Sequence, residues 1–370
     1  MTAALSAEVS GNKGEWSEIY ALIKLLRDGR IYAANENLER VSDVQYLPII
    51  KIRREEIPGE VYDYHTADSR EASVKIYHNG EFIKAIALSE FEVQTALLYR
   101  DLSTARTGNL KLGEIEGLSS FLNNLFVTKI KADNTQKADI IMEFLDINTG
   151  FRPIAGFSIK SQMGSASTLM NASSATNFIY KINGIDDDVM NAVNAINSKT
   201  KIIDRMAYLQ NHGAEFSFCE VSNPVFADNL EMIDSRMAEI MSHVMLYRYR
   251  DNVKSTVDII EKLCNDNPLR YRNNQIYRYK YKKLMCAVAL GMLPATVWDG
   301  LDEANGGYVI VKNNGDILAY YLYNRNYFEE YLLKTTFLEA PSTTRHHYAS
   351  VYKQGDAYFI NLNLQIRFKA

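Results

Sequence analysis

The chain has 370 residues, of which 47% are hydrophobic and 23% charged, and its formal net charge at pH 7 is −4. These values predict a folded protein of one large or two ordinary domains, and no apolar run is long enough for a transmembrane helix. The net negative charge excludes an argument for nucleic-acid binding from overall charge, so such binding must rest on local patches.

The cysteines and histidines argue against several other kinds of site. The three cysteines are Cys219, Cys264 and Cys286, and they have no CxxC spacing. An odd number of unclustered cysteines favours reduced thiols in a cytoplasm and argues against structural zinc. The six histidines are scattered, apart from the adjacent His346 and His347, and no metal-binding helix or Ser-His-Asp arrangement is visible.

The first predicted element is an amphipathic helix that ends at Gly29. Asn12 and Glu15 have the spacing of a capping box, which gives Glu15 a structural role. Glu18 lies on a stripe with Leu22 and Leu25, where a buried carboxylate would need a partner. Glu18 is therefore either a ligand or a solvated surface residue. The apolar residues with helical period are Trp16, Ile19, Tyr20, Ile23 and Leu26.

The next elements are strands and two helices. Strands are expected at residues 31–34 and 47–53, followed by a hairpin with an Asn79-Gly80 turn. Helices are expected at residues 88–99 and 114–125.

A hairpin then places an acid opposite a lysine. Residues 137–143 and 156–162 read as short strands on either side of a turn at residues 148–150. Because side chains alternate along a strand, Asp139 shares one face of its strand with Ile141 and Glu143. Ser158, Lys160 and Gln162 share one face of the other strand, so approach across the two strands is geometrically reasonable.

These residue types suit hydrolysis of a phosphodiester. That reaction needs a cation that neutralises developing charge and activates a water, and Mg²⁺ is held by one or two carboxylates with waters and substrate phosphate. Asp139 suits the ligand role. Lys160 suits the positioning or deprotonation of the water. The alternative is a structural pair, because an acid near the start of a strand and a lysine near the end of one are common.

The remaining elements are mixed. Residues 161–174 read as a loop, and helices are expected at residues 189–195, 232–247, 253–265, 283–292 and 327–334. Two further hairpins are expected around Asn314-Gly315 and Gln354-Gly355. The final strand, residues 358–368, alternates apolar and polar side chains, so one of its faces belongs to the core.

One segment is strongly basic. Residues 270–283 contain six positive charges, four tyrosines and no acid. Such a segment suits contacts with phosphates and base edges, and the alternative is a helix or strand with a solvated basic face. Arg345 lies near the polar face of the final strand and is a further candidate for DNA contact. The candidates in the basic segment are Arg270, Arg272, Arg278, Lys280, Lys282 and Lys283.

Three separated blocks resemble HpaII-type type II restriction endonucleases: residues 11–20, residues 156–162 continuing into 169–180, and residues 340–348. The resemblance implies a PD-(D/E)xK nuclease of the α/β (α+β) class, with a central mixed sheet flanked by helices and a helical and β-hairpin part for DNA recognition. It implies Mg²⁺-dependent cutting of double-stranded DNA at a short palindrome, CCGG being the family's best-known site.

The resemblance also assigns roles to individual residues. Asp139 and Lys160 match the catalytic pair, but Ser158 stands where the superfamily pattern usually has an acid. Related nucleases carry a glutamate on an early helix, which favours Glu18 as the replacement metal ligand, with Glu15 as a second candidate. Gln162 offers a neutral oxygen on the same strand face as Lys160 and could contact metal or phosphate. A glutamine without a functional role is an equal alternative.

We expect residues 1–200 to form the catalytic region and residues 201–370 the recognition region, unless the chain is one continuous domain. A palindromic target suggests a homodimer on DNA, with no obligate protein partner and no membrane. Two other functions remain open. One is a structure-specific or repair nuclease of the same superfamily, and the other is a DNA-binding protein without enzymatic activity.

Overall fold

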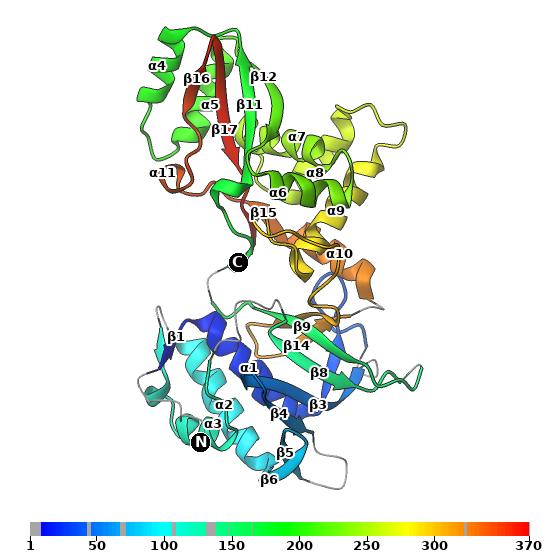
Figure 1. Cartoon of the computed structure of the whole chain (residues 1–370). Coiled ribbons are helices and arrows are strands. Elements are labelled where there is room, and N and C mark those ends of the chain that lie inside the picture. The colour runs from blue at the N-terminus through cyan, green and yellow to red at the C-terminus, as the bar shows by residue number, and fades with distance from the viewer. Residues whose placement is uncertain are drawn as a thin grey trace. The chain divides into compact units, whose positions relative to one another are not determined.

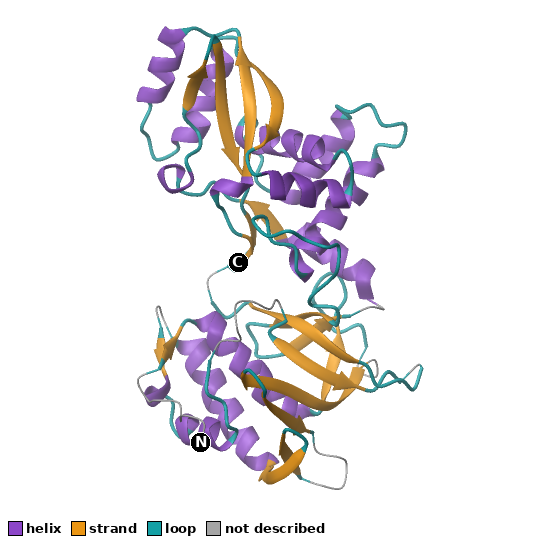
Figure 2. Ribbon diagram, viewed as in Figure 1, coloured by secondary structure: helices purple, strands orange, loops and turns teal. Residues whose placement is uncertain are grey.

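A computed structural model describes residues 9–42, 46–66, 72–105, 109–130, 138–147, 149–164, 166–321 and 324–369. Lys137 of the predicted hairpin and Asn148 of its turn lie outside these ranges. The described chain is of mixed α/β class, as predicted (Figure 2). None of its described helices is both long enough and apolar enough to span a bilayer.

The contacts divide the chain into two compact units. The first unit contains Met1–Ser167 and Asp302–Tyr331, and the second contains Thr168–Leu301 and Leu332–Lys369. This division differs from the expected one at residue 200. The chain leaves the first unit earlier than expected, and it later returns to add a segment to that unit.

A nine-stranded mixed sheet forms the centre of the first unit, in the order β2-β14-β13-β9-β8-β3-β4-β5-β6 (Figure 1). Strands β13 and β9 are parallel, whereas β9 and β8 form the predicted antiparallel hairpin. The strands are β2 (Arg30–Ala33), β3 (Tyr46–Ile57), β4 (Glu60–His65), β5 (Ser73–His78), β6 (Glu81–Ala87), β8 (Ile140–Phe144), β9 (Ile154–Ser161), β13 (Gly307–Val311) and β14 (Ile317–Tyr320).

Helices α1 (Lys13–Asp28), α2 (Leu88–Thr104) and α3 (Leu118–Asn124) contribute to the buried core of the first unit. Figure 1 shows α1 and α2 beside the sheet, and α1 contacts both β3 and β9. The first helix begins and ends as predicted, with Asn12 as its N-cap and Gly29, at φ 59°, as its C-cap. Smaller elements are β1 (Ser10–Gly11), β7 (Leu110–Lys111) and the 3-10 turn Leu112–Glu114.

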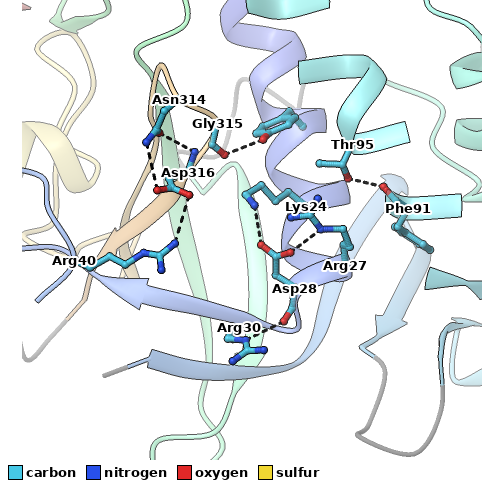
Figure 3. Close-up of polar contacts among 11 residues, drawn as sticks. Lys24, Arg27, Asp28, Arg30, Arg40, Phe91, Thr95, Asn314, Gly315 and Asp316 are labelled. Atoms are coloured by element: carbon cyan, nitrogen blue, oxygen red, sulfur yellow. Dashed lines mark hydrogen bonds and ion pairs between the residues drawn. The ribbon is translucent and has the colours of Figure 1, made fainter. Parts of the chain in front are cut away.

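The late segment is fastened to the N-terminal part of the first unit at the turn between β13 and β14. Tyr20 donates a hydrogen bond of 2.8 Å to the Gly315 carbonyl, and Arg40 lies 3.4 Å from the Asp316 carboxylate (Figure 3). At the end of these strands away from the turn, Phe328 of α10 (Arg325–Thr335) packs against Tyr308 and Tyr320. The predicted hairpin therefore forms, and residues far apart in sequence hold it.

The second unit contains a four-stranded sheet, ordered β12-β11-β17-β16, and a three-stranded sheet, ordered β10-β18-β15. The strands are β10 (Thr168–Met170), β11 (Asn177–Asn183), β12 (Glu215–Val221), β15 (Thr336–Leu338), β16 (Val351–Gln354), β17 (Ala357–Asn363) and β18 (Ile366–Phe368). The helices are the 3-10 turn Ser174–Thr176, α4 (Asp187–Ala195), α5 (Lys201–Asn211), α6 (Pro224–Ile233), α7 (Met237–Tyr249), α8 (Thr256–Asp266), α9 (Gln275–Leu290) and α11 (Thr343–His346).

Three local expectations for the second unit are wrong. The expected loop at residues 161–174 contains β10, and the expected helix at 232–247 is divided between α6 and α7. The expected final strand is divided into β17 and β18, which belong to different sheets. Periodicity continues across this break, because Leu362, Leu364 and Ile366 are all buried, so alternation alone does not reveal it.

Candidate active site

Asp139 directly precedes β8, and two hydrogen bonds hold its carboxylate. Its backbone N–H donates to the Phe157 carbonyl at 2.9 Å, which extends the pairing of β8 with β9 by one residue. Its Oδ2 accepts hydrogen bonds from the Ile159 backbone N–H at 2.6 Å and from Ser158 Oγ at 3.2 Å. No described residue donates to Oδ1. One oxygen is therefore fixed by the protein, and the second is free to bind a cation.

Lys160 lies on the same sheet face as Asp139. Ile140 pairs with Phe157, the Asp139 carboxylate accepts a hydrogen bond from Ser158 Oγ, and Lys160 follows Ser158 by two residues along β9. This is the face predicted from alternation. Lys160 is half-buried, and no described carboxylate lies within ion-pairing distance of its ammonium. The Lys160 Nζ lies 5.9 Å from the centroid of the Tyr308 ring.

The first half of α1 lies along the C-terminal end of β9. Ser17 Oγ donates to the Lys13 carbonyl and lies 2.7 Å from Ser161 Oγ. A Cβ added to Gly164 would lie 3.2 Å from Lys13 Cβ. The start of α1 and the end of β9 are therefore neighbours in the first unit.

The two glutamates of α1 differ in their surroundings. Glu15 Oε2 accepts the Asn12 N–H at 2.8 Å, and Asn12 Oδ1 accepts the Glu15 N–H at 3.1 Å, which confirms the capping box. The carboxylate of Glu15 therefore already has a structural partner. Glu18 is half-buried and directly follows Ser17, which contacts β9. Gln162 is exposed just beyond β9, and its backbone N–H donates to the Val311 carbonyl at 2.9 Å.

The predicted metal ligands do not form a closed cage. Within the described ranges, no three Asp, Glu, His or Cys side chains gather so that they could hold a metal ion. Asp139, Glu18 and Glu15 are all described, so they are not a three-carboxylate cluster. An open site with one or two carboxylates suits Mg²⁺, which keeps several waters and takes further ligands from substrate phosphate. The free Oδ1 of Asp139 fits that requirement.

The sheet face that carries Asp139 and Lys160 also carries a network of ion pairs, which sequence reasoning missed. Arg53 donates two hydrogen bonds to Asp63, at 2.7 and 2.9 Å. Lys51 Nζ lies 3.1 Å from Asp63 and 3.5 Å from Glu143. Arg53 pairs with Ile141 and Lys51 with Glu143, so this network continues the face from β8. The alternation of Lys51 and Arg53 on an expected strand was the available signal.

Burial and charge set the protonation of this network. Burial acts to raise the pKa of Asp63, but hydrogen bonds from Arg53 and Lys51 outweigh it and lower that pKa. Burial, followed by the charge of Lys51, lowers the pKa of His65 on the same strand. At neutral pH, Asp63 is therefore ionised and His65 is neutral. The network therefore forms a charged surface on the sheet face that carries Asp139 and Lys160.

The predicted DNA-binding residues all lie in the second unit. The basic segment forms the approach to α9 and its first half, and its tyrosines Tyr277 and Tyr281 are fully buried. Lys280 is paired with Asp234 at 2.8 Å and lies 3.1 Å from Tyr271 Oη, so the segment has an acidic partner that its own sequence lacks. Three of the predicted DNA-binding residues are exposed, namely Arg270, Arg272 and Arg345. The other four are half-buried, namely Arg278, Lys280, Lys282 and Lys283.

Comparisons with known proteins identify the family of the chain. The model of a family described as HpaII restriction endonuclease matches residues 12–368. The "Type II restriction enzyme HpaII" of Haemophilus parainfluenzae is 37% identical over 362 residues, which covers 97% of this chain and 98% of that protein. No solved structure matches the chain significantly. The chain belongs to the HpaII restriction endonuclease family and is a site-specific DNA endonuclease of type II.

Proposed function

We propose that this protein hydrolyses double-stranded DNA at CCGG in a Mg²⁺-dependent reaction, with Asp139 and Lys160 in the catalytic site. The observation that carries the proposal is the Asp139 carboxylate, which has one oxygen held by Ile159 and Ser158 and the other free. Restriction endonucleases generally use a divalent metal ion. Full-length similarity to HpaII supports the CCGG target and favours restriction over repair or passive DNA binding.

Each residue has a distinct role in the proposed reaction. Asp139 would hold the metal ion through Oδ1, and Glu18 is the candidate for the carboxylate that is absent at Ser158. When bound, Mg²⁺ supplies positive charge that stabilises the phosphoryl oxygens and acidifies the attacking water. Lys160 orients that water and donates hydrogen bonds to the phosphate oxygens. The water oxygen bonds to phosphorus as the bond to the leaving oxygen breaks.

Ser158 keeps the site functional without an acid at its position. Its hydroxyl donates to Asp139 Oδ2, so it orients the carboxylate that binds metal. A second carboxylate at this buried position would lie beside Asp139 and would be repelled by it in the absence of metal. Glu15, by contrast, serves the capping box in this proposal, and Gln162 remains a candidate for contact with phosphate.

The function is tested by incubating supercoiled plasmid with the protein and Mg²⁺ and then sequencing the ends. We expect every end to lie within CCGG, and we expect Asp139→Ala to leave the plasmid intact.

A palindrome presents two equivalent phosphates, so we propose that two chains act as a dimer on DNA. A dimer should linearise plasmid without accumulating the nicked form. Ends at unrelated sequences would contradict the CCGG assignment, and stable nicked plasmid would contradict the dimer.

The exposed arginines of the second unit should contact the DNA backbone. Replacement of Arg270 and Arg272 by Gln should weaken binding to cognate and unrelated duplexes alike, because phosphate contacts carry no sequence information. The slope of log K against log salt should fall by about 0.9 for each lost phosphate contact. Fluorescence anisotropy in Ca²⁺ measures both effects. Arg345→Gln tests the remaining exposed arginine in the same way.

Lys353→Gln is the matched control for the arginine variants. Lys353 lies in the same unit, but its ammonium is engaged by Asp187 at 2.9 Å. Its replacement removes one positive charge and should leave the salt slope unchanged. If the arginine variants keep the wild-type slope, the basic segment does not face DNA.

We also propose that the protein acts in the cytoplasm. Cys219, Cys264 and Cys286 are all free thiols, in agreement with the prediction.

A further inference from the structure

The hydroxyl of Tyr308 is buried beside the proposed catalytic pair and has no hydrogen-bond partner. Tyr308 is 0% exposed, and its Oη makes no hydrogen bond to any described group. Buried polar groups are paired in the great majority of cases, so an unpaired one calls for an explanation. If this position served only the packing of the core, phenylalanine would be more favourable than tyrosine, because it fills the same space without a desolvated hydroxyl.

Tyr308 shares the sheet face of Asp139 and Lys160. In the parallel pairing of β13 with β9, Tyr308 lies opposite Ser158, and Lys160 lies opposite Ile310. The Lys160 ammonium lies 5.9 Å from the Tyr308 ring centroid, which is within the range of a cation–π contact. Burial first, and then the neighbouring Tyr331 and Asp139, raise the pKa of Tyr308, so the phenol keeps its proton at working pH.

The surrounding backbone prevents Tyr308 from moving to another partner. A Cβ on Gly306 would lie 2.5 Å from the Phe157 ring and 2.8 Å from the Gly156 carbonyl, so β13 approaches β9 closely. On its other side, the Tyr308 ring packs 5.0 Å from Phe328. The ring is therefore fixed between β9 and α10.

We propose that Tyr308 is a positioning residue for Lys160: its ring holds the ammonium, and its hydroxyl anchors a water molecule shared with Lys160 Nζ. This inference rests on the proposed role of Lys160 in cleavage. A buried water with several polar partners is a normal structural element, and Asp139 and Lys160 supply polar groups on the same face. In this proposal the hydroxyl serves the site around Lys160, and it does not stabilise the core.

Tyr308→Phe removes the hydroxyl and keeps the ring. We expect the single-turnover cleavage rate to fall roughly 10-fold to 100-fold, the scale for loss of a group that orients a catalytic one. Binding to a cognate duplex in Ca²⁺ should be unchanged. The melting temperature should change little, because the hydroxyl makes no hydrogen bond to another described group of the protein.

Tyr320→Phe is the matched control. Tyr320 packs against the same Phe328 ring, but its hydroxyl donates to the Asn35 carbonyl at 2.7 Å. This variant should lower the melting temperature and leave the single-turnover cleavage rate as in the wild type.

The outcomes separate this inference from the proposed function. Wild-type cleavage by Tyr308→Phe, with an inactive Lys160→Ala, would defeat the role of Tyr308 alone. A melting temperature lowered as far in Tyr308→Phe as in Tyr320→Phe would show that the Tyr308 hydroxyl bonds to another group of the protein, which also overturns the inference. Normal cleavage by Lys160→Ala would instead defeat the assignment of the hairpin.

Discussion

Lys160→Ala is expected to lower the rate of DNA cleavage by about 10²-fold or more, the scale for one lost acid–base group. Asp139→Ala should have an effect at least as large, because it removes the free oxygen that would bind the metal ion. Both variants should bind cognate duplex in Ca²⁺, because the proposed backbone contacts lie on other residues. Single-turnover cleavage of a labelled duplex measures the rate, and anisotropy measures the binding. Full cutting activity in either variant would overturn the site.

Variants of Ser158, Glu15 and Glu18 allow the contributions of individual residues to the cleavage rate to be compared. Ser158→Ala should cost less than Asp139→Ala, because the Ile159 N–H still holds Asp139 Oδ2 at 2.6 Å. Glu15→Gln is the control on α1, because glutamine removes a carboxylate yet still completes a capping box. It should cleave at the wild-type rate, whereas Glu18→Gln should be impaired if Glu18 supplies the second carboxylate. Equal activity in all variants except Lys160→Ala would leave Asp139 without a role.

Gly307→Ala is expected to destabilise the first unit by about 4 kcal/mol or more. Gly307 has φ 124°, and an added Cβ would lie 1.9 Å from the Tyr320 carbonyl oxygen. Both the backbone conformation and this contact exclude a side chain, so β13 must shift away from β14. Urea unfolding measures the effect. Trp16 lies in the first unit and Trp298 in the second, so a Trp298→Phe background makes Trp16 fluorescence report on the first unit.

Gly59→Ala is the control for the glycine prediction. Gly59 also has positive φ, at 85°, but no atom lies within 4 Å of an added Cβ. Its replacement should cost only about 1 kcal/mol from backbone strain. If Gly307→Ala unfolds at the same urea concentration as Gly59→Ala, the close approach of β13 to β14 is not a constraint.

The sequence predicted the elements whose signals are local. Asn12, Glu15 and Gly29 are cap residues with fixed spacing, and they do begin and end α1. The Asn79-Gly80 turn forms the hairpin of β5 and β6, because both residues adopt the positive φ that such turns require. The face shared by Asp139 and Lys160 follows from a period of two residues, which also depends only on neighbours along the chain.

The parts that sequence reasoning missed depend on contacts between distant segments. Tyr308 lies about 150 residues from Lys160 in sequence, and nothing local indicates that β13 joins β9 in parallel. Asp234 neutralises Lys280 from another helix, so the charge of the basic segment could not be judged from that segment alone. The division of the chain was missed for the same reason. Composition does not change where the chain leaves one compact unit and later returns.

That late return affects how the protein is made. Strand β13 covers the edge of β9, and β14 joins β13 to β2, so the sheet is complete only after Tyr320 has been synthesised. A nascent chain that ends before Asp302 would present an uncovered edge of β9, which is a site for pairing with other chains. The ribosome must therefore have synthesised the chain through Val311 before Lys160 acquires its full surroundings. Incomplete or prematurely terminated chains should lack the ability to damage the chromosome of the cell that makes them.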